Sequence, residues 1–292
     1  MIRFLIAALL VCFALPSHAE WRERRAALGE MYRVGEFRIF FSRSGEDALP
    51  NGEDANRNGT PDYVERIARE LVSAREMYEE QLRLASPMAS ARYRNQVEFI
   101  DVNLLSFPLS PGGPKHGVAY DELSSFARKQ DGGRKVRVLV IDISNSVPAN
   151  NATAAHELFH LYQNGYTFFK NRWYTEGTAR WVEQLNKAGA GRLPKSPEEV
   201  QALFRQTYDA APFWRRLATQ LDPGGGSFLK AFLEELDRSD GAANPGGKWR
   251  EADQMSGAND IYLWRALRST LNQPEFVPRW DQDIRDLMAI EP

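Results

Sequence analysis

Hydrophobic and polar positions follow different patterns in the two halves of the chain. In the first half, three short segments are rich in β-branched and aromatic residues, as is typical of strands; they are residues 35–42, 96–103 and 135–143. Residues 62–84, between the first two, have apolar positions at helical spacing and predict a long amphipathic helix. Residues 106–115 are rich in Pro and Gly, which predicts a surface loop.

From residue 150 onward the pattern is almost entirely helical. The predicted helices are residues 150–164, 174–187, 197–208, 212–221, 226–237 and 259–271. Residues 240–257 are Gly-rich and predict a loop. Strands first and helices later favour an α+β fold, with a mixed N-terminal sheet and a long helix followed by a mostly helical half. The pattern divides the chain into an N-terminal half, residues 20–148, and a helical half, residues 149–292.

Residues 1–19 have the features of a secretory signal peptide. Arg3 supplies a positive charge, residues 4–15 are apolar but too short to cross a bilayer, and Ala19 ends a small-x-small cleavage site. We therefore expect an exported protein, periplasmic or secreted. No other segment is long or apolar enough to span a membrane, so we expect no stable membrane insertion after cleavage.

The composition of the mature chain indicates how the protein is stabilised and which partners to expect. Cleavage after residue 19 would leave 273 residues with no cysteine, since Cys12 is the only one. Without disulfides, an exported protein must be stabilised by its core, by metal or by both. The mature chain would hold 36 Lys plus Arg against 39 Asp plus Glu, a net charge of −3. That balance gives no reason to expect nucleic acid as a partner.

The clearest candidate for chemistry is a His-Glu-x-x-His stretch at residues 156–160. On a helix, His156 and His160 share one face and can bind one zinc ion, while Glu157 can reach a water on that ion. The chain has four histidines, and two of the three outside the predicted signal peptide lie in this motif. Asn150 or Asn151 is a suitable N-cap for such a helix.

A catalytic zinc site requires a third protein ligand. No histidine follows His160, so the third ligand would be a carboxylate or His116. The alternative is a core helix whose histidines merely bond to neighbouring groups. That alternative leaves Glu157 buried without a purpose.

The segment downstream of the motif completes a family pattern. Residues 173–183 contain Glu-Gly-x-Ala flanked by aromatic residues, and together with the His-Glu-x-x-His stretch this resembles the gluzincin metallopeptidases. The resemblance implies that Glu176 is the third zinc ligand. Fifteen residues separate Glu176 from His160, slightly fewer than in the aminopeptidase branch of that group. It also implies a zincin-like fold whose active-site cleft lies between the halves, under an edge strand that can pair with extended substrate.

Three further residues are candidates for supporting roles. Glu183 lies two turns beyond Glu176 on the same helix face and would accept a hydrogen bond from a ligand histidine; a solvated helix face is the alternative. Tyr208 matches a Tyr in a segment that follows the glutamate helix of gluzincin-like peptidases, and on that resemblance it would stabilise the oxyanion. A Tyr packed at a helix end is its alternative. His116 is the second candidate oxyanion donor, or a solvated loop histidine.

Residues 54–65 fill the EF-hand calcium-loop pattern, with Gly59 at the sharp turn. The oxygen donors are Asp54, Asn56, Asn58, Asp62 and Glu65, with the main-chain carbonyl of Thr60. Pro61 lacks the N–H that pairs two EF-hands, so we expect one isolated structural calcium loop; a plain turn is the alternative. Residues 36–65 resemble a secreted bacterial family of zinc peptidases that pair a calcium-type loop with a later His-Glu-x-x-His.

These observations favour a secreted zinc metallopeptidase, with Glu157 as general base and a protein or peptide as substrate. Two other functions remain open. One is a catalytically silent binding protein that keeps the metal site as a scaffold, and the other is a zinc hydrolase of a non-peptide bond.

Overall fold

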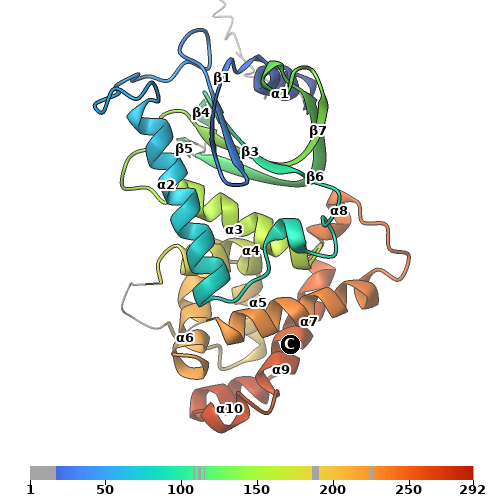
Figure 1. Ribbon diagram of the computed structural model, residues 1–292. Helices are drawn as coiled ribbons and strands as arrows, with labels where there is room; N and C mark the ends of the chain where they lie inside the picture. The colour runs from blue at the N-terminus through green and yellow to red at the C-terminus, as the bar shows by residue number, and fades with distance from the viewer. Residues whose placement is uncertain are drawn as a thin grey trace, which may run out of the picture.

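Two stacked parts make up the described chain, a sheet above and a group of helices below (Figure 1). The computed structural model describes residues 18–107, 109–110, 113–114, 116–185, 191–223 and 226–291. The predicted signal peptide lies outside the described residues up to residue 17. A five-stranded mixed sheet is followed along the chain by helices, so the predicted α+β class is confirmed.

The main sheet has the strand order β1-β2-β3-β7-β6. Its strands are β1 (Glu30–Val34), β2 (Phe37–Phe41), β3 (Phe99–Leu105), β6 (Gly117–Ala127) and β7 (Lys135–Ser144). β2, β3 and β7 run parallel to one another, whereas β1 and β6 are antiparallel to their neighbours. A separate antiparallel pair, β4 (Leu109–Ser110) with β5 (Gly113–Pro114), forms in the predicted loop.

The three predicted strands correspond to the central strands β2, β3 and β7. The sequence prediction missed β1 and β6, which occupy the two edges of the sheet. Their residues are mostly half-buried, so they lack the continuous apolar run of the central strands. An edge strand pairs on one side only, and polar residues there are common.

The described residues contain ten α-helices. They are α1 (His18–Ala27), α2 (Asp62–Glu76), α3 (Thr153–Tyr166), α4 (Arg172–Val182), α5 (Pro197–Phe204), α6 (Ala211–Leu221), α7 (Ser227–Ala243), α8 (Glu251–Gln254), α9 (Asp260–Leu271) and α10 (Gln282–Met288). The six helices predicted from residue 150 onward are all present, and α2 continues as a π-helical turn, Met77–Gln81. None of the described helices is both long enough and apolar enough to cross a membrane.

Several boundaries differ from the prediction. The helix predicted over residues 174–187 ends at Val182. The helix predicted over residues 197–208 ends at Phe204, and Thr207 beyond it has non-helical backbone angles, φ −128° and ψ −111°. Residues 240–257 are not all loop, since α7 runs to Ala243 and α8 follows. Asp240 explains the longer α7, because its buried carboxylate accepts hydrogen bonds from the Thr167 hydroxyl at 2.8 Å and the Phe168 N–H at 2.9 Å.

One hydrophobic core joins the sheet to the helices. Apolar side chains on one sheet face, such as Ile39, Val102 and Ile141, pack in the same buried cluster as residues of α2 and α3. The cluster continues through α4, α6, α7 and α9. α3 therefore lies between the sheet and the remaining helices, with both of its sides covered (Figure 1).

The opposite sheet face carries a buried charged network beneath α1. Arg25 of α1 donates to both carboxylate oxygens of Asp142 on β7, at 2.6–3.0 Å. Arg38 pairs with Asp101 at 2.7 Å, and Arg128 donates to Asn103 at 2.8 Å. Buried charges are tolerated when they are paired in this way. The network fixes α1 and the end of β7, the strand beside β6.

The start of α3 is capped by a distant residue. We predicted Asn150 or Asn151 as its N-cap, but Ala152 occupies that position and makes no side-chain cap bond. The carboxylate of Glu70, on α2, accepts the N–H of Ala155 at 3.0 Å. A carboxylate at a helix start is favoured by the helix dipole, so α2 both caps and positions α3.

Candidate metal centre

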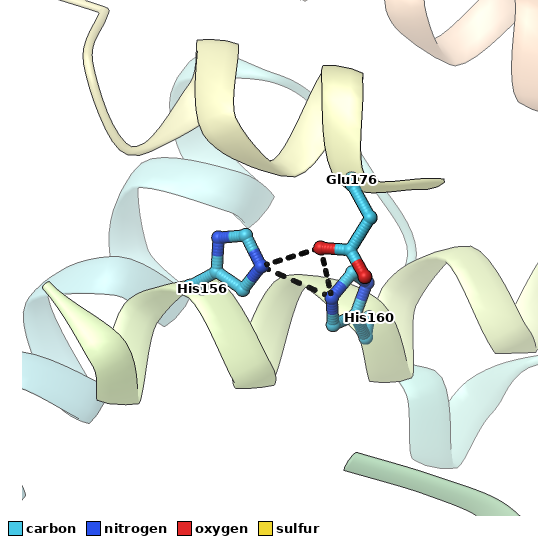
Figure 2. Close-up of side chains that lie close together, drawn as sticks. All are labelled: His156, His160 and Glu176. Atoms are coloured by element: carbon cyan, nitrogen blue, oxygen red, sulfur yellow. Dashed lines mark hydrogen bonds and ion pairs between the residues drawn. The ribbon is translucent and has the colours of Figure 1, made fainter. Parts of the chain in front are cut away.

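Two histidines on α3 and one glutamate on α4 converge at a single point (Figure 2). His156 Nε2 lies 3.2 Å from His160 Nε2 and 3.2 Å from Glu176 Oε2. His160 Nε2 lies 3.7 Å from the same glutamate oxygen. The histidines project from consecutive turns of one helix, and the carboxylate reaches them from the second helix.

The spacing and chemistry of these atoms fit a zinc ion. Zinc takes imidazole nitrogen and carboxylate oxygen at about 2.0–2.2 Å in a tetrahedral arrangement, which sets the ligand atoms about 3.4 Å apart. The three separations between His156, His160 and Glu176 are 3.2, 3.2 and 3.7 Å. Three protein ligands are the number typical of a catalytic site. In the described part of the chain, this is the one group of His, Cys, Asp and Glu ligand atoms that converges so closely.

Each histidine is held by a hydrogen bond at its other ring nitrogen. His156 Nδ1 lies 2.9 Å from Glu183 Oε2, which is the contact that we predicted between Glu183 and a ligand histidine. His160 Nδ1 lies 2.7 Å from Gln163 Oε1. Both partners are acceptors, so the Nδ1 atoms carry protons, and Nε2 is the nitrogen of each ring that is placed to bind a metal.

Gln163 is a site residue that sequence reasoning missed. Its amide nitrogen donates to the Thr175 carbonyl at 3.0 Å and the Thr178 hydroxyl at 2.7 Å, both on α4. These two bonds fix its oxygen as the acceptor that faces His160. The only sequence signal was its position three residues after His160, on the same helix face.

The carboxylates of Glu176 and Glu183 favour a positive charge between them. Burial disfavours protonation of His156, but hydrogen bonds to Glu176 and Glu183 outweigh burial and raise its pKa to about 10. Burial likewise opposes ionisation of Glu176, yet its bonds to the two histidines hold its pKa well below the usual range. Such a site stabilises a cation at the point where the three ligand atoms meet.

Glu157 lies on α3 between the histidines, beside the edge strand β6. Its side chain is buried, which raises its pKa, although the two histidines and the main-chain N–H of Ala119 act in the opposite direction. Gly117 packs directly on it, because a Cβ at residue 117 would lie 2.5 Å from Glu157 Cγ. Only glycine permits this approach of strand and helix.

Tyr208 opens a short 3-10 turn, Tyr208–Ala210, that lies against α4. Its ring centroid is 5.8 Å from that of His156. Burial and the hydrogen-bonded Glu176 carboxylate raise its pKa to about 12, so its hydroxyl keeps a proton at neutral pH. The side chain is still 45% exposed, so its hydroxyl borders both the metal centre and solvent.

Gly177, the residue after Glu176 on α4, faces the turn that carries Tyr208 and the helix α6. A Cβ there would lie 2.8 Å from Ala210 Cβ and 2.9 Å from Trp214 Nε1. Gly177 therefore allows the turn that carries Tyr208 to pack closely on α4.

The remaining predicted residues lie elsewhere. His116 precedes Gly117, and its carbonyl accepts the N–H of Ser144 at 2.8 Å; it does not belong to the converging ligand group of the described residues. The calcium-type loop, residues 54–65, runs into the first turn of α2, which begins at Asp62. No protein-family model matches the chain, and no significant match was found among curated proteins or solved structures.

Proposed function

We propose that this protein is an exported zinc-dependent metallopeptidase of gluzincin type, with a zincin-like arrangement of sheet, histidine helix and glutamate helix. One observation carries the proposal. Two Nε2 atoms from α3 and one carboxylate oxygen from α4 lie 3.2–3.7 Å from one another, as the ligand atoms of one zinc ion would. The buried carboxyl of Glu157 lies beside them. Its substrate would be a protein or peptide, running through a cleft along the edge strand β6.

In the proposed mechanism, His156, His160 and Glu176 hold the metal. A bound zinc ion would act as a Lewis acid on the scissile carbonyl and on the attacking water. Glu157 accepts a proton from that water at its carboxylate and later passes it to the leaving amine. Because Glu157 is buried, bulk solvent does not reach the proton that it accepts. The Tyr208 hydroxyl, which keeps its proton, donates to the oxyanion of the tetrahedral intermediate.

The two rival functions differ in what they require of Glu157. A silent metal scaffold has no need of a buried carboxyl beside the metal ligands, where burial is costly. A zinc hydrolase of a non-peptide bond would use the same residues. In the described sheet β6 is an edge strand, and main-chain groups of an edge strand can pair with an extended peptide, which favours a peptide substrate.

Metal analysis and a peptide digest test this proposal. We expect the purified mature protein to bind one zinc ion and to cleave members of a peptide library. A chelator should abolish cleavage, and added zinc should restore it. Bound zinc without cleavage of any peptide would support the scaffold or the non-peptide hydrolase instead.

We also propose that residues 54–65 bind a structural calcium ion. Gly59, with φ +90°, makes the sharp turn of the loop. Asp54 accepts the N–H of Asn58 at 3.1 Å, and Glu65 bonds to the amides of Asn56 and Asn58, so oxygen donors line the loop. The donor set is oxygen only, as calcium requires, although the loop carboxylates converge less closely than the zinc ligands.

Calcium should raise the melting temperature of the zinc-loaded Glu157→Gln protein, which cannot digest itself. At a Kd near 10⁻⁴–10⁻³ M, calcium at about 5 mM would add about 1–2 kcal/mol. Asp54→Ala or Glu65→Ala should remove this increase without releasing zinc. A melting temperature that is unchanged by calcium would leave the segment as a turn before α2.

A further inference from the structure

The edge strand β6 contains an irregularity close to the metal centre. Its pairing with β7 is regular from Gly117 to Tyr120, opposite Ile143 to Val140, and then shifts before Ser124 pairs with Val138. Four steps along β6 correspond to two along β7, so β6 has two additional residues and residues 121–123 form a bulge. Bulges often occur beside active sites, where they redirect a side chain.

Asp121, the first residue of the bulge, is held by three side chains. Its carboxylate accepts a hydrogen bond from Arg92 at 3.2 Å and forms an ion pair with Lys170 at 3.4 Å. Its main-chain carbonyl accepts the Tyr93 hydroxyl at 2.9 Å. Burial opposes ionisation of Asp121, but Lys170 and Arg92 outweigh it and lower the pKa of this carboxyl. We call these four residues the Asp121 clamp.

The same two cations also bind the last turns of the histidine helix. Arg92 donates to the Asn164 carbonyl at 2.8 Å, and Lys170 donates to the Asn164 side-chain oxygen. Asn164 follows His160 by one turn and shares its helix face. The clamp therefore joins the bulge of β6 to α3, about 6 Å along the helix from the second histidine.

The other end of this strand segment touches the candidate general base. Gly117 packs on Glu157 and Thr153, because a Cβ there would lie 2.5 Å from Glu157 Cγ and 2.8 Å from the Thr153 methyl carbon. β6 and α3 thus run side by side in one direction, from Gly117 beside Thr153 to Asp121 beside Asn164. In the described part of the chain, β7 is the one strand that pairs with this segment, and that pairing is interrupted at the bulge.

We infer that Asp121 is a positioning residue that fixes the edge strand against α3 and thereby keeps Gly117 packed on the side chain of Glu157. The part of this inference that concerns catalysis rests on the proposed function. Asp121 touches none of the metal ligands, so it acts through the strand. The bulge turns its carboxylate out of the sheet toward Arg92 and Lys170, and two separate chain segments anchor the strand at that point.

The test compares Asp121→Asn with Glu122→Gln. The first removes the charge that holds Arg92 and Lys170, and the second removes an exposed carboxylate from the same bulge. For Asp121→Asn we expect amide hydrogen exchange over residues 117–123 to become about tenfold faster or more, with zinc affinity unchanged. The kcat per zinc-loaded molecule should fall about 10–100-fold, because a displacement of about 1 Å can cost that much. KM should change less.

Glu122→Gln should match the parent in all these measurements, and Asp121→Glu, which keeps the charge, should recover part of the kcat. Unchanged exchange in Asp121→Asn would overturn the inference. Faster exchange with an unchanged kcat would also overturn it, because Asp121 would then serve stability alone. If the parent cleaves no peptide, the proposed function fails, and exchange over residues 117–123 still decides whether the clamp holds the strand on α3.

Discussion

Glu157→Gln is expected to keep zinc bound and to lose peptide hydrolysis. The amide has nearly the same shape as the carboxyl but cannot accept a proton from water, and general-base catalysis typically contributes about 10²–10⁴-fold to the rate. Glu157 provides none of the three converging ligand atoms, so zinc should remain bound. The measurement is kcat/KM on a cleaved peptide, with zinc content determined on the same sample.

Glu122→Gln is the matched control for this substitution. It makes the same chemical change on the exposed part of β6 and should leave kcat/KM unchanged. A Glu157→Gln protein that cleaves as fast as the parent would show that another group takes the proton. Loss of zinc from Glu157→Gln would instead mean that the residue supports the metal, and the kinetic result could not be attributed to proton transfer.

Glu176→Ala is expected to lower zinc affinity far more than Glu183→Ala. Glu176 Oε2 lies 3.2 and 3.7 Å from the two Nε2 atoms, so its removal takes one of three ligand atoms away. Glu183 contacts the outer nitrogen of His156 at 2.9 Å and orients the ring. Loss of such an outer contact typically costs about 10–100-fold in affinity. Equilibrium zinc titration of both variants measures the difference.

Glu183→Gln provides the control for orientation. The amide oxygen can still accept the Nδ1 proton of His156, so this variant should bind zinc more tightly than Glu183→Ala. A larger loss of affinity at Glu183 than at Glu176 would reverse the two assignments. Equal losses would mean that both carboxylates contribute directly to the metal.

The sequence indicated the local elements best where the pattern was long and periodic. The helices that carry the histidines and Glu176 were predicted because their apolar positions repeat at helical spacing over more than two turns. The predicted helix over residues 197–208 was too long, because it ends at Phe204 and the following residues form the separate turn Tyr208–Ala210, which packs against α4. The edge strand β6 was missed because its residues are half-buried and mixed in polarity.

The sequence by itself determined the ligand types and their place on helical faces, because i and i+4 spacing is a property of the helix alone. It also determined the α+β order of the elements. Only the tertiary structure decided which distant groups meet. Gln163 on Thr178, Glu70 at the start of α3 and Gly117 on Glu157 are contacts that depend on how helices and strands pack. Such contacts leave no recognisable spacing in the sequence, because the number of residues between two partners on different elements does not fix how far apart they lie in space.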